Sequence, residues 1–446
     1  RAQPRSRGLG DVYKRQLEAG GINFQASSLD IKTVAAGGGS LLWFDGRKLQ
    51  VGPESAGANP GPVCYGHDGK LTLTDANLLL GRINPDFFPQ VFGPEQNQKL
   101  NTNETKDKFE NLMSEVNKST LSSFSSEELA LGFVDIANEK MAGAIKEISV
   151  SRGYDVRDHA LVCFGGAAPQ HCCGIARILG IKQIVIHPLS SLLSAYGIAN
   201  SEQFRYGLRS MVKKFDSHSH AKALSAIQSL ESPLIDELQE LGVPSDNITK
   251  KNFMDLRVAG TDSTLTIACS NFDQMIVSFE EKHTNLFGFS PSGELEIANI
   301  RVEVSGSRTK IEEQKPNPNL STPATIGQSE VYFNNQSAST PIYSRDSLPE
   351  GFELAGPAMI TDLNSTIVIE PGFTAGINVG GHIIINQKTF RKSQISTEKD
   401  PVSLEIFNNL FMSIAEQMGF TLKLSLIHIS EPTRPRLISY AVFCLK

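Results

Sequence analysis

Apolar residues recur at three- and four-residue steps in two long stretches of the chain, a pattern that predicts amphipathic helices. The first stretch is residues 126–152, where Ser126 is the expected N-cap and Gly153 is placed to end the helix. The second stretch is residues 217–241. In both, the apolar stripe marks the face that packs against a core, so neither helix carries a functional claim.

Short apolar runs between glycine turns predict strands. Residues 160–164 form one such run and lead into a glycine turn, residues 172–181 have helical spacing, and residues 181–188 form a second buried run. Strand, helix and strand in succession are typical of an α/β lobe. Alternation across residues 253–269 predicts a strand pair in a small α/β unit, and the runs within 331–387 predict a compact β-rich module.

Changes in composition along the chain predict its domain organisation. Residues 310–330 are polar and rich in proline, which favours a linker. A helical pattern after residue 400 has one apolar face, and a lone helix of this kind needs a partner surface. The expected order is an α/β lobe at 17–203, a small α/β unit at 204–309, the linker, a β-rich module at 331–390 and the final helix within 400–424.

The two ends of the chain differ from the rest. Residues 1–16 and 425–446 resemble translated sequencing-adaptor sequence rather than protein, and we expect neither to pack in the fold. The chain begins with Arg1 rather than Met, and its last helical pattern stops at Lys423. We therefore expect this chain to be an internal piece of a longer polypeptide.

Composition and charge narrow the classes of function. The 446 residues are 40% hydrophobic, enough for several cores, and the net charge is −6 with no basic block, which argues against nucleic acid and anionic membrane as partners. No apolar run reaches the ~18 residues that span a bilayer. The odd number and uneven spacing of the cysteines between residues 17 and 424 suit reduced thiols in a cytoplasmic protein. A small-molecule substrate fits these features better than a nucleic acid or a membrane does.

Cysteines gather near His171 without predicting a metal site. Cys163, Cys172 and Cys173 are close in sequence, but adjacent cysteines without a second CxxC pair do not match zinc spacing. We therefore assign no metal ligands and expect these thiols to pack as small hydrophobic groups.

Two glycine turns are candidates for contact with a ligand. Gly165 and Gly166 stand between a predicted strand and a helix start, where backbone amides can face anionic or polar groups. The run from Gly37 to Ser40 is either a wall of a catalytic cleft or a tight turn with close packing. The residues alone leave both interpretations open.

Four polar side chains are candidates for chemistry. Asp75 follows a short strand and either holds Mg²⁺ through water, orients the substrate, or caps the next helix in an Asx turn. Glu54 lies in a loop rich in glycine and proline and is a candidate polar orienter. His171 either donates to substrate or phosphate or is a structurally satisfied imidazole. Arg257 suits a carboxylate ligand, or else forms a salt bridge on its strand.

Several long segments together resemble one family. VGPESAGANPGPVCYG from Val51, DIKTVAAGGGS from Asp30 and CFGGAAPQHCCGIARILGIKQIVIHP from Cys163 resemble the hydantoinase A/5-oxoprolinase family, and the resemblance covers roughly residues 17–424. DPVSLEIF from Asp400 resembles the opening of a B-type half, as in the long family members that fuse an A-type half to a B-type half.

The resemblance implies a fold and a reaction. The fold is α/β: part of an actin-like ATPase lobe, followed by the small α/β unit and the β-rich module. The reaction is ATP-dependent opening of the lactam of 5-oxo-L-proline to L-glutamate, in which phosphorylation of the carbonyl oxygen makes a poor electrophile a good one. ATP and Mg²⁺ are the implied cofactors, with K⁺ as a further family association, and the implied setting is glutathione metabolism in the cytoplasm.

The resemblance also implies roles for individual residues. FGGAAPQH resembles the loop on the adenosine side of the nucleotide, although Ala168 and Pro169 stand where relatives usually have glycine, which restricts the backbone. LRVAGTD resembles a segment that we assign to the substrate carboxylate. The implied sites are Asp75, Glu54 and His171 for catalysis, Gly37, Gly38, Gly39, Ser40, Gly165, Gly166 and Gln170 for the nucleotide, and Arg257 and Asp262 for the substrate.

The resemblance leaves alternatives and implies missing parts. The phosphate-binding loops of actin-like ATPases are absent, so we expect this chain alone to be inactive and to need an upstream lobe and a downstream B-type half as partners, in a homo-oligomer. The enzyme alternatives are an N-methylhydantoinase or an acetone-carboxylase-type subunit. A non-catalytic scaffold is the alternative of another class.

Overall fold

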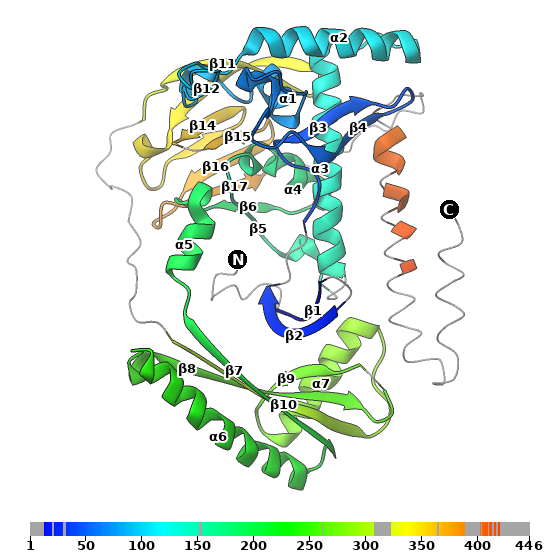
Figure 1. Ribbon diagram of the computed structural model, residues 1–446, viewed down its shortest axis with the longest axis vertical. Helices are drawn as coiled ribbons and strands as arrows, with labels where there is room; N and C mark the ends of the chain where they lie inside the picture. Colours follow the sequence, from blue (N-terminus) through cyan, green and yellow to red (C-terminus); the bar gives the residue numbers. More distant parts are fainter. Residues whose placement is uncertain are drawn as a thin grey trace. The chain divides into compact units, whose positions relative to one another are not determined.

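The computed structural model describes residues 13–19, 22–29, 33–150, 154–261, 263–306, 323–363 and 365–388, together with 402, 404–408, 410–412, 414, 415, 418 and 419. The chain divides into two compact units (Figure 1). The first unit is Arg1–Tyr196 with Glu313–Ile414, and the second is Gly197–Glu312 with Ala415–Lys446. The boundary falls within helix α5 (Leu193–Ala199).

A five-stranded sheet forms one layer of the first unit. Only its β5–β6 pair is parallel, and β17 pairs antiparallel with β6, with Ile383 opposite Ile186. The strand order is β13 (Glu353–Ala355), β16 (Phe373–Ile377), β17 (Ile383–Gln387), β6 (Gln183–Ile186) and β5 (Leu161–Cys163). The sequence patterns had indicated separate bodies for 17–203 and 331–390. The structure instead joins them in one sheet, because β17 pairs the edge of β6 that would otherwise present unpaired backbone groups.

A second sheet of the first unit packs on the same core. Its strands are β11 (Gly327–Phe333), β12 (Gln336–Ser344), β14 (Ala358–Asp362) and β15 (Ser365–Ile369). Every residue of β15 is buried, because Ile367 and Ile369 join the core of the five-stranded sheet while Val368 faces Val331 and Ile342 on the other side. A strand that is buried on both faces has a nearly continuous apolar sequence, and β15 has such a sequence.

The longest helix that the structure describes in the first unit is α3 (Ser126–Val150), which carries Phe133 and Ile136 into the core (Figure 1). The others are α1 (Leu73–Leu79), α2 (Thr102–Thr120) and α4 (Cys172–Leu179), with α5 at the boundary. The periodicity prediction of this helix is confirmed. Its expected cap is wrong by one residue: Ser125 accepts the Glu128 amide through Oγ and the Glu128 carboxylate accepts the Ser125 amide, which is a capping box.

Two hairpins also belong to the first unit: β1 (Tyr13–Ala19) with β2 (Ile22–Leu29), and β3 (Ser40–Phe44) with β4 (Leu49–Ser55). Residues 13–16 lie within β1, so the boundary expected at residue 16 falls inside a paired strand. Residues 425–446 lie outside the described part of the chain. Among the described residues, no helix is long and apolar enough to cross a membrane.

The helical residues that begin at Val402 pack on the first unit. Ile406 joins the core beneath β3 and β4. The Glu405 carboxylate is almost fully buried and lies 2.7 Å from Lys48 Nζ and 3.7 Å from Lys140 Nζ. A buried carboxylate needs such partners to offset its desolvation. This start of the final segment is therefore held by charge as well as by apolar contact.

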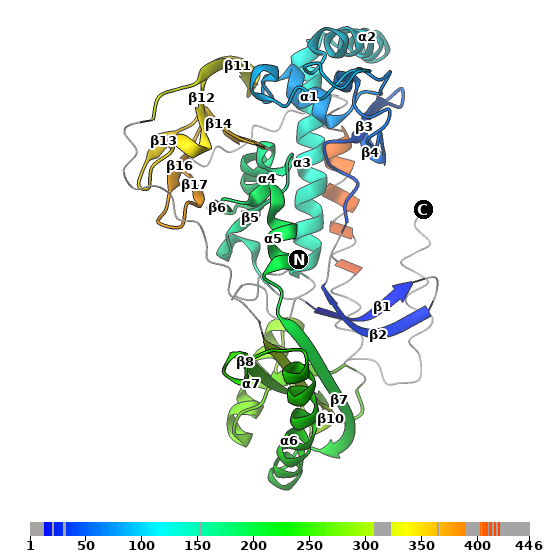
Figure 2. The same cartoon turned by 60° about the vertical axis from the view of Figure 1, so that its left-hand side comes forward.

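The second unit is an antiparallel sheet with two helices on one face (Figure 2). The sheet order is β7 (Gln203–Lys214), β10 (Leu295–Gly306), β8 (Ile248–Val258) and β9 (Leu265–Ala268), covered by α6 (Ser217–Glu240) and α7 (Phe272–Phe287). The predicted helix and strand pair are both confirmed. Asp216 caps α6 by accepting the Ser219 amide at 2.7 Å.

The same sheet contains a buried ion pair between Asp255 and Arg301. Both Asp255 carboxylate oxygens lie 2.7 Å from Arg301 Nη2, and both residues are at most 3% exposed. Thr266 donates a hydrogen bond of 2.6 Å to the same carboxylate. The pair connects β8 and β10 at their centre.

We expect Asp255→Ala to destabilise the second unit by about 3–5 kcal/mol, because it leaves a buried guanidinium without its counter-charge. The double variant Asp255→Leu with Arg301→Leu removes both charges and should recover most of that loss. Thermal unfolding of the whole protein and amide exchange in β8 and β10 measure both effects. Equal stability of the single and double variants would contradict this account.

Candidate functional site

The loop after β5 has free space beside its backbone. Gly165 has φ +96°, a conformation that side-chain-bearing residues rarely adopt, and its amide donates to the Ser190 carbonyl at 2.9 Å. A Cβ at Gly165 would meet no atom within 4 Å, and Gly166 is exposed. The loop therefore leaves room beside its backbone for a ligand.

Ala168 and Pro169 stand where relatives usually have glycine, and both residues fit the local structure. Residues Ala168–Gln170 form a short 3₁₀-helix, and Pro169 lies buried near its start, where the fixed φ of proline fits and its missing N–H costs nothing. The Pro169 carbonyl accepts the Cys172 thiol at 3.3 Å. The loop thus leads directly into α4.

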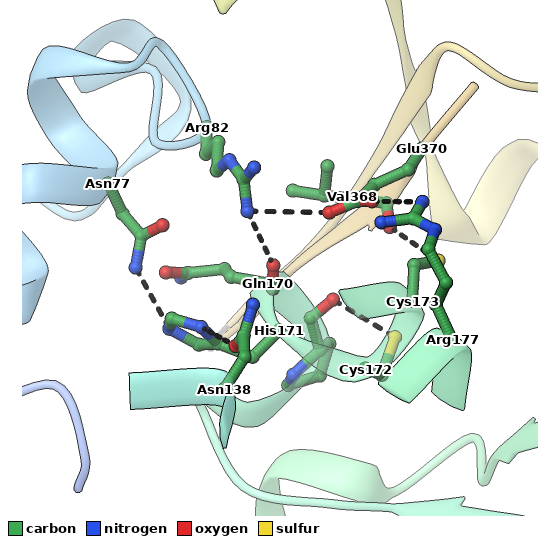
Figure 3. A network of polar contacts seen from close by, with 11 residues as sticks. Asn77, Arg82, Asn138, Gln170, His171, Cys172, Cys173, Arg177, Val368 and Glu370 are labelled. Atoms are coloured by element: carbon green, nitrogen blue, oxygen red, sulfur yellow. Dashed lines mark hydrogen bonds and ion pairs between the residues drawn. The ribbon is translucent and has the colours of Figure 1, made fainter. Parts of the chain in front are cut away.

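His171 is a fixed, neutral imidazole. It is 2% exposed, with Nδ1 2.9 Å from Asn138 Oδ1 and Nε2 3.0 Å from Asn77 Nδ2 (Figure 3). The amide orientations place the proton on Nδ1, which donates to Asn138, while Nε2 accepts from Asn77. Burial lowers the pKa of His171 to about 3, and the charge of Arg82 acts in the same direction. Of the two interpretations of His171, the geometry favours the satisfied imidazole.

Glu370 lies between two guanidinium groups and connects three segments of the first unit (Figure 3). Its carboxylate is 2.6 Å from Arg177 Nη2 on α4 and 3.5 Å from Arg82 Nη1, which follows α1. Arg82 also donates to the Gln170 carbonyl at 3.3 Å, so the ion pairs fix the end of the glycine loop. Sequence reasoning missed this cluster, although a glutamate directly after a fully buried strand was a signal.

Asp75 has its carboxylate fully engaged. It is 0% exposed and accepts the amides of Val63 at 3.2 Å and of Cys64 and Thr72 at 2.8 Å each, and the Thr72 hydroxyl at 2.9 Å. Burial raises the pKa of Asp75, and the hydrogen bonds from Cys64 and Thr72 oppose that rise. The geometry is that of a capping box which also holds the loop rich in glycine and proline.

The turn from Gly37 to Ser40 packs against the start of α1 and beside the second glycine loop. Gly38 O accepts both the amide and the hydroxyl of Thr74 at 2.9 Å, and the Ser40 hydroxyl accepts the Gly37 amide at 2.9 Å. A Cβ on Gly38 would lie 2.9 Å from Thr74 Oγ1 and 3.5 Å from the Cβ of Ala167. The structure therefore brings the two predicted glycine turns together, and close packing accounts for at least Gly38.

Three other predicted residues do not join this cluster. Glu54 is exposed at the end of β4. Arg257 belongs to the second unit and pairs with Glu296 on the neighbouring strand, with Nη2 and Nε each 3.1 Å from Oε2. This is the strand salt bridge that the sequence allowed as an alternative. Asp262 lies outside the described residues.

A buried side-chain atom near this cluster, Asn77 Oδ1, has no hydrogen-bond partner within the described part of the chain. It belongs to the amide whose nitrogen contacts His171. Sequence reasoning assigned no role to Asn77.

Comparisons with known proteins show which families and proteins the chain resembles. Residues 10–205 match the family model described as Hydantoinase/oxoprolinase, and residues 213–388 match the one described as Hydantoinase/oxoprolinase C-terminal domain. The chain is 38% identical to the 5-oxoprolinase of Dictyostelium discoideum over 91% of its own length and 33% of that protein. It is 37% identical to 5-oxoprolinase 1 of Arabidopsis thaliana, over 92% and 34% respectively. The chain thus spans about a third of the length of these curated relatives.

Two solved structures are similar to this chain in fold. The ATP-dependent caprolactamase of Pseudomonas jessenii is similar with a TM-score of 0.70 and 29% identity, covering 82% of this chain and 54% of that one. A nucleotide-free acetone carboxylase is similar in fold, with a TM-score of 0.62 and 20% identity over 84% of this chain and 55% of that one. From these matches, and from the segments that carry them, the chain belongs to the hydantoinase/oxoprolinase family.

Proposed function

We propose that the protein containing this chain opens a cyclic amide at the expense of ATP, with 5-oxo-L-proline as substrate and L-glutamate as product. The observation that carries the proposal is 37–38% identity to proteins named 5-oxoprolinase over more than nine-tenths of this chain. The glycine loop between β5 and α4 supports the proposal, because glycines without side chains let a nucleotide approach the backbone closely. In this proposal the first unit is part of an actin-like lobe.

The chemistry explains why ATP is needed. A lactam carbonyl is a poor electrophile, and transfer of a phosphoryl group to its oxygen makes the carbon open to attack. Bound ATP supplies that group. The residues of this chain would bind and orient: Gly165 and Gly166 beside the adenosine, and Gln170 toward the nucleotide or substrate.

The described residues do not fit a metal ion. No group of three or more His, Cys, Asp or Glu side chains within the described ranges could hold one, and the Asp75 oxygens are already taken by four donors. We therefore derive no step through Mg²⁺ or K⁺ from this chain. Asp75 is proposed instead to hold the loop from Val51 in shape, and His171 to hold Asn77 and Asn138 in place.

The proposal also covers the binding of the substrate carboxylate, the assembly of the protein and a competing substrate. Arg257 would bind the carboxylate of 5-oxoproline only by exchanging Glu296 for it, since the guanidinium is already paired. We also propose a cytoplasmic homo-oligomer in glutathione metabolism, with an upstream lobe and a B-type half as partners of this chain. Caprolactam is the competing cyclic amide to test, because the solved caprolactamase is similar in both fold and sequence.

We expect the full-length protein to release glutamate from 5-oxoproline only with ATP, and Gly165→Ala to raise KM for ATP about tenfold. Alanine at φ +96° is strained by roughly 1–3 kcal/mol, and the strain is relieved by moving the loop. KM for 5-oxoproline should change far less. Gly143→Ala is the matched control, because Gly143 lies in a helix and a Cβ there meets nothing within 4 Å.

Two outcomes would contradict these expectations. Faster ATP-dependent turnover of caprolactam than of 5-oxoproline would reassign the substrate. An unchanged KM for ATP in a folded Gly165→Ala protein would remove the loop from the nucleotide site.

His171 should contribute stability that depends on pH. Its folded pKa of about 3 lies below the usual value near 6.5, so the unfolded state takes up a proton first as the pH falls. The contribution is present above pH 6.5 and is lost between pH 6.5 and 3. We expect the stability difference between wild type and His171→Gln to shrink steadily across that window in denaturant titrations. A constant difference would show that His171 is not held neutral.

A further inference from the structure

The outer strand of the second unit's sheet has a free edge. β9 is the last strand in the order β7-β10-β8-β9, and among the described strands only β8 pairs with it. The Cys269 amide donates to the Asn252 carbonyl at 2.8 Å, and hydrogen-bonded and non-bonded pairs alternate along an antiparallel ladder. Thr266 and Ala268 therefore direct their backbone N–H and C=O groups away from β8. An edge of this kind can accept another strand.

One of these edge groups is occupied from within the unit. The Thr266 carbonyl accepts a hydrogen bond of 3.0 Å from Lys282 Nζ on α7. A lysine at a sheet edge is a device by which proteins prevent uncontrolled strand pairing. Here it covers one carbonyl and leaves the outward backbone groups of Ala268 without a partner among the described residues. Any strand that pairs with β9 has to displace this ammonium group.

A groove beside the edge adds a side-chain surface to it. Its volume is about 640 Å³, and its walls are β9 and α7, which lie side by side in the second unit (Figure 1). Residues 266–268 form the strand wall, and Asp273, Val277 and Lys282 are on the helix wall. Val277 is 52% exposed. A second strand and helix at this edge would bury that apolar side chain, which favours association.

The charges of the groove are placed symmetrically about its centre. Asp273 is in the first turn of α7, and Lys282 lies about 13.5 Å further along the helix, with Val277 and Ser278 midway between them. A two-fold rotation about that midpoint exchanges the two ends of the groove. It therefore brings Asp273 of one copy to Lys282 of another, and the reverse. An interface between identical chains related by a two-fold axis needs this kind of self-complementarity.

We propose that β9 and α7 form an interface between two copies of this chain, in which the two β9 strands pair antiparallel across a two-fold axis. Thr266 of one copy and Ala268 of the other would exchange two backbone hydrogen bonds, and the symmetric pair would exchange two more. The two four-stranded sheets would become one continuous sheet with both α7 helices on the same face. This inference names the surface of the proposed homo-oligomer and does not depend on the proposed reaction.

A second copy suits this surface better than an unrelated extended peptide does. A peptide would pair the backbone groups of β9 but would leave the displaced Lys282 ammonium without a fixed counter-charge. In the two-fold pair each displaced ammonium meets an Asp273 carboxylate, and a hydrogen bond between charged groups is stronger than one to a neutral carbonyl. The chain itself carries both charges at the required ends of the groove.

Charge reversal in the full-length protein tests the interface by sedimentation equilibrium. Asp273→Lys should raise the dimer dissociation constant at least about tenfold at low salt, because it places two lysines together at each end of the groove. The double variant Asp273→Lys with Lys282→Asp restores opposite charges across the axis and should return the constant to within about threefold of wild type. Glu280→Lys is the matched control, because Glu280 is exposed on α7 but does not line the groove.

Cross-linking locates the axis independently of affinity. Ser278→Cys, in a Cys269→Ser background, should form a disulfide with the same residue of the second copy when diamide oxidises the two thiols, because Ser278 lies beside the proposed axis. Glu280→Cys, on the opposite side of the helix, should run as a monomer on a non-reducing gel. A dimer that forms without the Ser278→Cys disulfide would overturn the proposal, as would a dissociation constant that is the same in wild type and all the charge variants.

Amide exchange separates this occupant of the groove from others. The outward amides of Thr266 and Ala268 should exchange slowly at concentrations where the dimer forms and rapidly after dilution to monomer. A monomer in which these amides exchange slowly would show that another part of the same polypeptide covers the edge, and would overturn the proposal. Thermal unfolding of each variant shows that a raised dissociation constant does not come from a misfolded second unit.

The two proposals fail in different ways. Absence of ATP-dependent glutamate release by a dimeric wild-type protein overturns the proposed function only. A wild-type protein that releases glutamate as a monomer overturns only the interface at β9 and α7.

Discussion

The first unit depends on the Glu370 carboxylate held between Arg82 and Arg177. The three residues come from segments that are distant in sequence: the turn after α1, helix α4 and the end of β15. Burying these charges is costly, and only close pairing with hydrogen bonds offsets that cost. Because Arg82 also donates to the Gln170 carbonyl, the same contacts set the shape of the glycine loop. The loop is open where Gly165 lies and rigid where it enters α4, which is what a ligand-contacting backbone requires.

The polar side chains around this loop fall into two kinds. Asp75 and His171 have the residue types expected of catalytic groups, yet every hydrogen-bonding position of the Asp75 carboxylate and the His171 ring that matters for proton exchange is occupied. Asn77 Oδ1 is buried and has no such partner among the described residues. A buried polar group that is satisfied stabilises one conformation, whereas one that is left unpaired destabilises the fold unless something else benefits. Residue type alone therefore does not identify which polar groups of this region are available to a ligand.

Local patterns were enough for much of the fold, and long-range pairing was not. Helices α3 and α6 follow from apolar periodicity, and β8 with β9 follows from alternation, because these signals lie within one segment. The pairing of β6 with β17 joins residues about two hundred positions apart and leaves no mark in either strand beyond a short apolar run. The same holds for the site: the glycine loop could be predicted from its spacing, but the ion pairs of Glu370 with Arg82 and Arg177 join three segments that are distant in sequence.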